Sequence, residues 1–471
     1  MLKGGTKIMQ NINHLNLKIQ GVNYIKLMSL EITHKDNDHG YAELNLEVDP
    51  SEAARFVDCA NENTTITITT SAEGQHPVLF CGGVISAGLS HMSQYTCLNI
   101  KLVSASHKLD IKKVSRTFQN TGSTYEDILN KVCAGRAVTN IAVTDRPIGN
   151  MKLQNKETDW QFIMRMASEL SASVFTTVHA QKPQISVGVP SLGTVTLPNT
   201  VESKQGLDVE GFSKFAQNSN ALAGSTSFGA ESIQSEKYCY IGEKINVNGG
   251  SSVISTVSCN MQKGILKCSY SLLKESGFER AEVNNSSTGG KMFMGTVQAV
   301  KGDKVQVFFH EIDGSYDDGG TQWFPYSTSY SSSDGSGFYC MPEVGDQVRV
   351  FMPSNNEKDA FVASSVNLNP QSNTRDKSWK APGGKEILLT DDGIYIICDE
   401  EKIFINLTTE KGIEVTSDKN IEITSDANIT LKAGKKIEMK AENVISMEVG
   451  NSNIQMDSQQ IVLGADKVFV N

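Results

Sequence analysis

The chain has 471 residues, of which 39% are hydrophobic and 20% charged, and its formal net charge is −10 at pH 7. A chain of this length is expected to form three or four domains. From Lys385 onward, sixteen acidic residues stand against nine lysines and no arginine. This acidic excess argues against binding of nucleic acid or of anionic lipid, because both favour clustered Lys and Arg.

The nine cysteines are scattered singly, with no CxxC pair and no zinc-site spacing. Most lie in apolar, strand-like contexts, where a free thiol packs as a small hydrophobe. We therefore expect free thiols and a protein built in a reducing cytosol. Residues 1–8 lack the apolar core of a signal peptide, and no stretch approaches the roughly 18 apolar residues of a membrane span. Export would then not depend on a cleaved signal.

Residues 10–120 carry a strand pattern. Apolar and polar residues alternate over Leu15–Ile19, Leu44–Val48 and Thr65–Thr69, with turn residues between them. Further strands are expected around 78–85 and 96–104, and a short helix over Pro50–Val57. This spacing predicts a small β-barrel or sandwich.

Two helices interrupt the strands, at about residues 123–134 and 158–171. The second begins with Thr158 followed three residues later by Gln161, which is the pattern of a capping box. We assign Trp160 and the apolar stripe of this helix to the core. The stripe consists of Phe162, Ile163, Met166, Ala167 and Leu170.

Residues 203–237 are rich in Ser, Asn, Gly and Gln and are predicted to form a long surface excursion. Strands are expected again at Tyr238–Ile241, Ser252–Ser258 and Leu266–Leu272. A polar boundary over 284–290 ends this first region. The sequence thus places one domain of strands with a few helices over residues 1–285.

Residues 290–368 form the next predicted domain. Short strands such as Gly295–Val297 and Lys304–Phe309 are followed by a long central loop, and five strands with such a loop suit an OB-fold barrel. The loop contains Asp313, Asp317 and Asp318, but their spacing does not match a calcium-binding loop. Residues 369–384 contain two prolines and a Gly-Gly pair, and we assign them to a linker.

Residues 385–471 repeat with a period of eight. Isoleucines recur in exact octads from 413 to 445, a nine-residue step and a seven-residue step follow, and a second apolar residue lies two positions after each isoleucine. Alternate side chains of a strand face opposite ways, so both apolar residues of a unit point inward and the residue between them points outward. These inward positions are Ile413, Val415, Ile421, Ile423, Ile429, Leu431, Ile437, Met439, Ile445, Met447, Ile454, Met456, Ile461 and Leu463.

A strand of about five residues and a turn make one side of a prism and cannot cover their own apolar stripe. Either three octads of one chain close a coil, or three chains each supply one side of every layer. An ordinary antiparallel meander is the third possibility, and the regular octads count against it. The turns show no 24-residue super-period, which slightly favours three chains.

The order of these parts resembles the VgrG spike proteins of contractile injection systems, which are related to the hub and spike of phage tails. The matching stretches are Ser115–Gln119, Glu157–Arg165, Gly337–Phe338 with Pro342–Asp346, and Trp379 with Pro382–Lys385, followed by the octads. The lysozyme-like insertion of some relatives is absent between barrel and repeat, and the chain stops at Asn471 without an effector domain.

This resemblance implies a homotrimer assembled in the bacterial cytoplasm as part of an injection particle. Residues 1–285 would form the hub, made of two small β-barrels with a few helices, and would bind the inner tube and baseplate components. The OB domains would form a collar, and the repeats would intertwine as a trimeric β-helix. A PAAR-type tip protein would cap the end, contacting Val468, Phe469, Val470 and Asn471. Effector cargo is a further possible partner.

Motifs for chemistry are sparse. The sequence has no GxSxG, HExxH, P-loop or GxGxxG, and no cofactor or metal ion is expected. Asp391 and Asp392 are adjacent and would face opposite ways in a strand, so a turn is favoured over a glycosidase pair. We expect no enzyme. A trimeric tail fibre or adhesin remains an alternative, as does a single-chain β-helix polysaccharide lyase.

Overall fold

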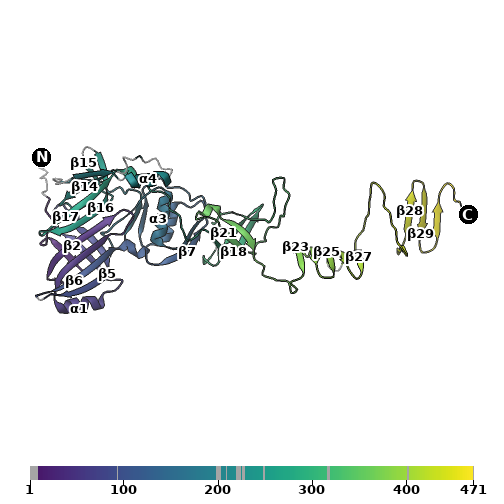
Figure 1. Cartoon of the computed structure of the whole chain (residues 1–471), viewed down its shortest axis with the longest axis horizontal. Coiled ribbons are helices and arrows are strands. Elements are labelled where there is room, and N and C mark those ends of the chain that lie inside the picture. The colour runs from purple at the N-terminus through teal and green to yellow at the C-terminus, as the bar shows by residue number, and fades with distance from the viewer. Residues whose placement is uncertain are drawn as a thin grey trace, which may run out of the picture. The chain divides into compact units, whose positions relative to one another are not determined.

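The computed structural model describes residues 9–92, 94–197, 203–207, 209–218, 224, 229–247, 250–315, 319–399 and 402–469. The chain divides into two compact units, Met1–Leu368 and Asn369–Asn471, which are described here separately. Strands dominate both units, as the sequence predicts (Figure 1).

A 12-stranded sheet organises the first unit. Its strands run in the order β1-β4-β5-β6-β3-β2-β16-β17-β14-β13, and β15 joins β16 to β12. Antiparallel pairing of β2 with β16 joins the early strands to the late ones. The strands are β1 (Leu17–Gln20), β2 (Lys26–Lys35), β3 (Tyr41–Val48), β4 (Thr65–Thr70), β5 (Val78–His91), β6 (Thr96–Ser104), β12 (Thr194–Val195), β13 (Ser203–Leu207), β14 (Gly229–Ser235), β15 (Lys244–Val247), β16 (Gly250–Gln262) and β17 (Ile265–Leu273).

A helical module packs beside this sheet and has its own core. It holds α2 (Tyr125–Cys133) and α3 (Asp159–Glu169), a three-stranded sheet of β8 (Val138–Ile141), β10 (Val174–Thr176) and β11 (Gln184–Val187), and the pair β7 (Lys113–Phe118) and β9 (Lys152–Thr158). Capping boxes begin both helices, Thr124 with Asp127 and Thr158 with Gln161. The two predicted helices are therefore confirmed, each ending slightly earlier than expected. Helix α1 (Pro50–Cys59) is also present as predicted, and 3₁₀ turns occur at Ala105–Leu109, Glu275–Phe278 and Glu357–Asp359.

Two element predictions in this unit were wrong. Residues 203–237 include β13, helix α4 (Val209–Asn218) and β14, and β14 pairs with β17 rather than forming an excursion. Tyr238–Ile241 is not a strand. Its buried polar groups bond outside any ladder, because the Tyr238 hydroxyl donates to the Leu79 carbonyl and the Cys239 N–H donates to the Tyr270 hydroxyl.

Cysteine pairing also differs from the expectation that every thiol is free. Cys259 of β16 and Cys268 of β17 form a disulfide. The two residues are direct partners in the antiparallel register of these strands, which brings their side chains together on one face. The spacing of the cysteines in the sequence gave no indication of this pair, because the two side chains meet only through the register of the β16–β17 hairpin.

Residues 291–365 form a five-stranded sheet in the order β20-β19-β18-β21-β22. The predicted loop around Asp313 lies between the second and third strands along the chain, and a longer irregular segment, residues 326–346, separates the third strand from the fourth. The strands are β18 (Lys291–Lys301), β19 (Lys304–Phe308), β20 (Phe324–Pro325), β21 (Gln347–Met352) and β22 (Phe361–Ser365).

The core of this barrel is not made by the barrel alone. Met151 and Leu153, at the start of β9, are buried in the same cluster as Val297, Val307 and Phe324. The helical module therefore inserts two side chains into this barrel.

We expect Leu153→Ala to lower the free energy of unfolding by about 2–5 kcal/mol, because it empties a fully enclosed site. Urea unfolding of the full chain measures this loss. Leu207→Ala is the matched control, since Leu207 is exposed on β13 and its truncation removes no buried contact. Equal stability of Leu153→Ala and the native chain would contradict a shared core.

The second unit contains two antiparallel sheets. The first consists of β23 (Lys377–Lys380), β24 (Glu386–Leu389), β25 (Gly393–Asp399), β26 (Ile403–Thr408) and β27 (Gly412–Ser417) in chain order. The second consists of β28 (Ile445–Val449), β29 (Ser452–Met456) and β30 (Ile461–Gly464). In the single chain these strands form meanders of adjacent neighbours, and β23 lies within the segment that the sequence assigned to a linker.

Candidate assembly site

The apolar stripe of the second unit is exposed to solvent in the single chain. Twelve of the fourteen predicted inward residues are classed as exposed, and the other two, Ile445 and Met456, are half-buried. Ile413, Ile423 and Leu431 each expose more than 70% of their surface. A row of large apolar side chains of this length is expected to be covered by another surface.

Strand register gathers part of the stripe on one face. Val415 and Ile413 of β27 lie opposite Ile405 and Leu407 of β26. In the second sheet Met447 lies opposite Ile454, and Ile454 lies opposite Leu463. Direct partners in an antiparallel pair point to the same side, so each sheet carries one continuous apolar face. The same register places Ile445 opposite Met456, and Met456 opposite Ile461.

The middle of the stripe has no partner strand within the chain. Residues 418–444 are all exposed, and Figure 1 draws them between β27 and β28 without arrows. Over 419–444, all of them described, no backbone N–H or C=O bonds to another backbone group. This stretch contains Ile421, Ile423, Ile429, Leu431, Ile437 and Met439. A strand-prone segment with neither its backbone nor its apolar residues covered is incomplete as a single chain.

The predicted tip contacts lie at the end of this unit. Val468 and Phe469 are exposed, and Phe469 exposes 85% of its surface. Val470 and Asn471 lie outside the described residues. The contact of all four with a tip protein stays a prediction.

A buried ion network joins the helical module to the OB domain, and the sequence gave no signal for it. The Arg165 guanidinium of α3 lies 2.9 Å from the Glu357 carboxylate and 3.1 Å from that of Glu157. It also donates to the Leu153 carbonyl. Burial acts to lower the pKa of Arg165, but the two carboxylates outweigh it and hold that pKa above its ordinary value. Residues 165 and 357 are too far apart in the chain for a pattern to have linked them.

The acidic residues weighed as chemical groups serve structural roles. Asp313 accepts hydrogen bonds from the Thr117 N–H, at 2.8 Å, and from the Thr117 hydroxyl. Burial raises the pKa of Asp313, against the effect of these bonds. Asp317 and Asp318 lie outside the described residues. Across the described ranges no cluster of three or more His, Cys, Asp or Glu side chains could hold a metal ion.

Asp391 and Asp392 lie in the turn between β24 and β25, as predicted. The Asp392 carboxylate accepts hydrogen bonds from the hydroxyls of Thr390, at 2.5 Å, and Tyr395, at 2.9 Å. These bonds lower the pKa of Asp392. The carboxylate thus closes its own turn.

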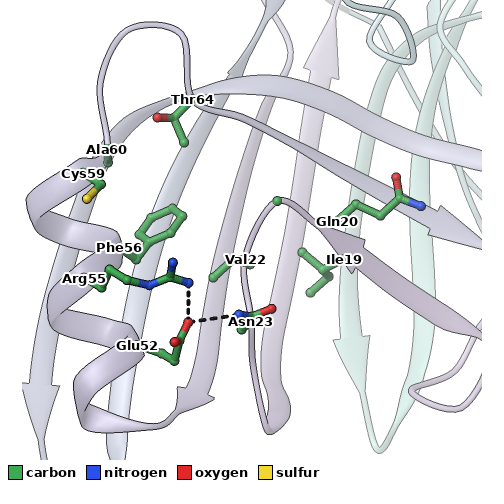
Figure 2. Close-up of a pocket in the computed structure, with 11 residues that line it drawn as sticks. Ile19, Gln20, Val22, Asn23, Glu52, Arg55, Phe56, Cys59, Ala60 and Thr64 are labelled. Atoms are coloured by element: carbon green, nitrogen blue, oxygen red, sulfur yellow. Dashed lines mark hydrogen bonds and ion pairs between the residues drawn. The ribbon is translucent and has the colours of Figure 1, made fainter.

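A pocket of about 500 Å³ lies between α1 and the segment 19–23 (Figure 2). Its charged side chains pair with each other, because Glu52 accepts from Arg55 at 2.6 Å and from Asn23 at 3.0 Å. Phe56 and Val22 point into the same space from opposite sides. The arrangement stabilises the end of the sheet and holds no group set for catalysis.

No helix in the described part of the chain is both long and apolar enough to cross a membrane. Among curated proteins, none matches the chain. Residues 294–366 match the family model described as the Type VI secretion system/phage-baseplate injector OB domain.

Two solved structures share the fold of most of the chain. The E. coli c3393 protein, described as a component of the type VI secretion system with structural similarity to the T4 bacteriophage tail proteins gp27 and gp5, is 14% identical with a TM-score of 0.52. That match covers 74% of this chain and 99% of the other. A chain of the half-lidded Francisella PdpA-VgrG complex is 8% identical with a TM-score of 0.53, covering 85% of this chain and 87% of the other. The resemblance to VgrG-type spike proteins is thereby confirmed at the level of the fold, and residues 294–366 are similar to the injector OB domain of the Type VI secretion system and phage baseplate.

Proposed function

We propose that the chain is the protomer of a homotrimeric spike, which joins the inner tube and baseplate of a contractile injection system to a membrane-piercing needle. The unit before Leu368 would be the hub and collar. Residues 385–471 would be one third of the needle. The proposed role is mechanical, with no catalytic step and no nucleic acid.

The observation that carries this proposal is the uncovered stretch 418–444. Its isoleucines recur every eight residues, all its residues are exposed, and over 419–444 its backbone groups lack backbone partners. Two further chains would provide partners for the backbone groups and cover for the apolar side chains. Each strand would bond to neighbouring strands, and each apolar pair would face a shared axis. The assembled prism would have no free sheet edge along its length.

The acidic residues of the repeat are consistent with a needle that passes through a membrane without adsorbing to it. The positions between the inward residues include Glu414, Glu422 and Glu438. These side chains would face water once the stripe is buried, keeping the needle soluble and free of anionic lipid.

The partners follow from the same proposal. The hub would contact the inner tube and baseplate components, and Val468–Asn471 would contact a PAAR-type tip protein. A chain similar to this one belongs to a structure described as a Francisella PdpA-VgrG complex, which supports a protein partner for the proposed spike. Effector cargo on this chain is proposed on that ground alone.

Two alternative functions, a tail fibre or adhesin and a β-helix lyase, would require different properties of the chain. A tail fibre or adhesin would use the same repeat, but it would lack affinity for a tube protein. A single-chain β-helix lyase would need its own strands to seal its isoleucines. The exposed stripe is unfavourable for the lyase, and the injector OB domain is unfavourable for the adhesin.

Hydrogen exchange of residues 419–444 in the full-length protein tests the proposal. If three chains pair, these amides should exchange at least about a hundredfold more slowly than their unstructured rates. The amides of Ser333 and Asp334, in an exposed turn, provide the fast-exchanging comparison. Exchange of 419–444 at unstructured rates in the full-length protein would contradict the proposal.

A further inference from the structure

Five of the eight histidines of the chain gather where the 12-stranded sheet meets the helical module. They are His34, His39, His76, His107 and His179. Nothing in the proposed spike function uses them, and no metal-binding group includes them among the described residues. These side chains lie in the contact between the 12-stranded sheet and the helical module, which we call the joint.

The turn between β2 and β3 inserts into the helical module. Asn37 donates its N–H to the Val174 carbonyl at 2.8 Å, and its side-chain oxygen accepts from the Val174 N–H at 2.7 Å. Asp36 pairs with Arg280 at 2.5 Å, and Asp38 lies near Lys35 on the outer side. These bonds attach the β2–β3 turn to the helical module, and they last only as long as the turn and the module stay packed together.

His39 is the buried centre of that turn. Its Nδ1 lies 2.8 Å from the Ser106 hydroxyl, and its ring stacks 4.5 Å from the Trp160 ring of α3. The His107 ring meets it edge-on at 5.4 Å. Its Nε2 has no hydrogen-bond partner, and the nearest carboxylate, Asp110, is 3.6 Å away. The positive charge that a proton on Nε2 brings would therefore be only partly balanced by Asp110.

His34 is the second buried ring and faces a cavity of about 250 Å³. Its Nε2 lies 3.1 Å from the Thr176 hydroxyl of β10. On the far side of the cavity the Tyr240 ring lies between His76 and His179, 4.3 and 4.6 Å from them. The one carboxylate lining this space is Glu243, which is 3.0 Å from His76 Nε2. One buried acid therefore faces three imidazoles.

Each of three imidazoles is held neutral by its surroundings. Burial lowers the pKa of His34 to about 3, with His39 and His179 adding to the effect. Burial also lowers the pKa of His39, helped by His107 and opposed by Asp110 and Asp38. The pKa of His179 falls through burial and then His76, against Glu243.

These lowered pKa values make the closed joint less stable as the pH falls. A histidine whose folded pKa lies below the ordinary 6.5 stabilises the closed joint above pH 6.5, and that contribution is lost as the pH falls below it. For His34 alone, lowering the pH from 7.5 to 5 should favour an opened joint by about 30-fold. His39 and His179 act in the same direction.

We propose that this histidine cluster makes the joint an acid-sensitive release point, where protonation frees the β2–β3 turn and β10 from each other while the large sheet stays paired. The strand ladders of β5 and β6 contain none of His34, His39 and His179, and they meet the joint where the Cys81 N–H donates to the Val178 carbonyl and the Ser104 N–H donates to the Gly40 carbonyl. Away from Cys81 and Ser104 these ladders do not share the acid sensitivity. The inference concerns the hub and does not depend on the proposed trimer.

Hydrogen exchange of the full-length protein between pH 7.5 and 5, corrected for the intrinsic effect of pH, tests this. Protection of the Asn37 and Val174 amides, which bond across the joint, should fall by about 30-fold or more, while that of 84–91 and 96–103 should stay constant. His34→Gln, which keeps a polar partner for Thr176, should remove most of the acid response. His179→Gln provides a second variant, and His310→Gln in the OB domain is the control that should change nothing.

Two results would overturn the proposal. One is constant protection of the joint down to pH 5. The other is equal loss of protection in the joint and in β5 and β6, which would mean that acid unfolds the whole unit instead of opening the joint. A response that survives in both His34→Gln and His179→Gln would exclude these rings as its source.

Discussion

Ile429→Asp should leave the chain monomeric. In the proposed needle residue 429 faces the threefold axis, so the substitution would bring three carboxylates together at one level of a dry interior. Each buried charge costs several kcal/mol even after relaxation, and like charges at close range add to that cost. We expect no trimer at micromolar concentration by sedimentation velocity.

Thr430→Asp is the matched control for this variant. It adds the same charge one residue later, where the side chain of a strand faces the opposite way. Thr430→Asp should therefore assemble as the native protein does. If Ile429→Asp also assembled normally, residue 429 could not lie on the axis, and the inward set Ile413 to Leu463 would have to be reassigned.

Arg165→Ala should destabilise the first unit by about 3–5 kcal/mol, because it leaves Glu157 and Glu357 buried without their cation. The Arg165 and Glu357 side chains are 3% and 5% exposed, so water cannot replace the lost partner. Urea unfolding, followed by tryptophan fluorescence, to which Trp160 of α3 and Trp323 of the OB domain both contribute, measures the loss. The effect should appear in the OB domain as well as in the hub, since Arg165 connects them.

Two comparisons show whether the charge itself is responsible. Lys214→Ala breaks the exposed pair of Lys214 with Glu210 and should change stability by less than about 0.5 kcal/mol. The double variant Arg165→Met with Glu357→Met replaces the buried Arg165–Glu357 pair with apolar groups and should recover part of the loss. A change below 1 kcal/mol for Arg165→Ala would show that the network carries little of the hub-to-OB contact.

Local patterns predicted local structure well. The Thr158–Gln161 capping box placed the start of α3, and alternation placed β3, β4 and β17 close to their observed bounds. These features depend on residues within a few positions of one another. The octads likewise identified which side chains of the second unit would form a stripe, although the single chain cannot show what covers it.

Contacts distant in sequence were missed. Met151 and Leu153 fill the core of a barrel that begins 140 residues later, at Lys291, and Cys259 meets Cys268 only through the register of a hairpin. The joint at His39 combines a turn, a 3₁₀ segment and α3. No composition or period marks such sites, because the sequence does not state which surfaces pack together.

The mass of the full-length protein in solution tests the central claim most directly. Sedimentation equilibrium at micromolar concentration should give about three times the 51.2 kDa of one chain, with no dissociation on dilution because the apolar stripe is buried only in the trimer. A single species of 51.2 kDa, with the stripe 413–463 protected from exchange, would mean that the chain seals its own isoleucines, and the proposed spike would be excluded.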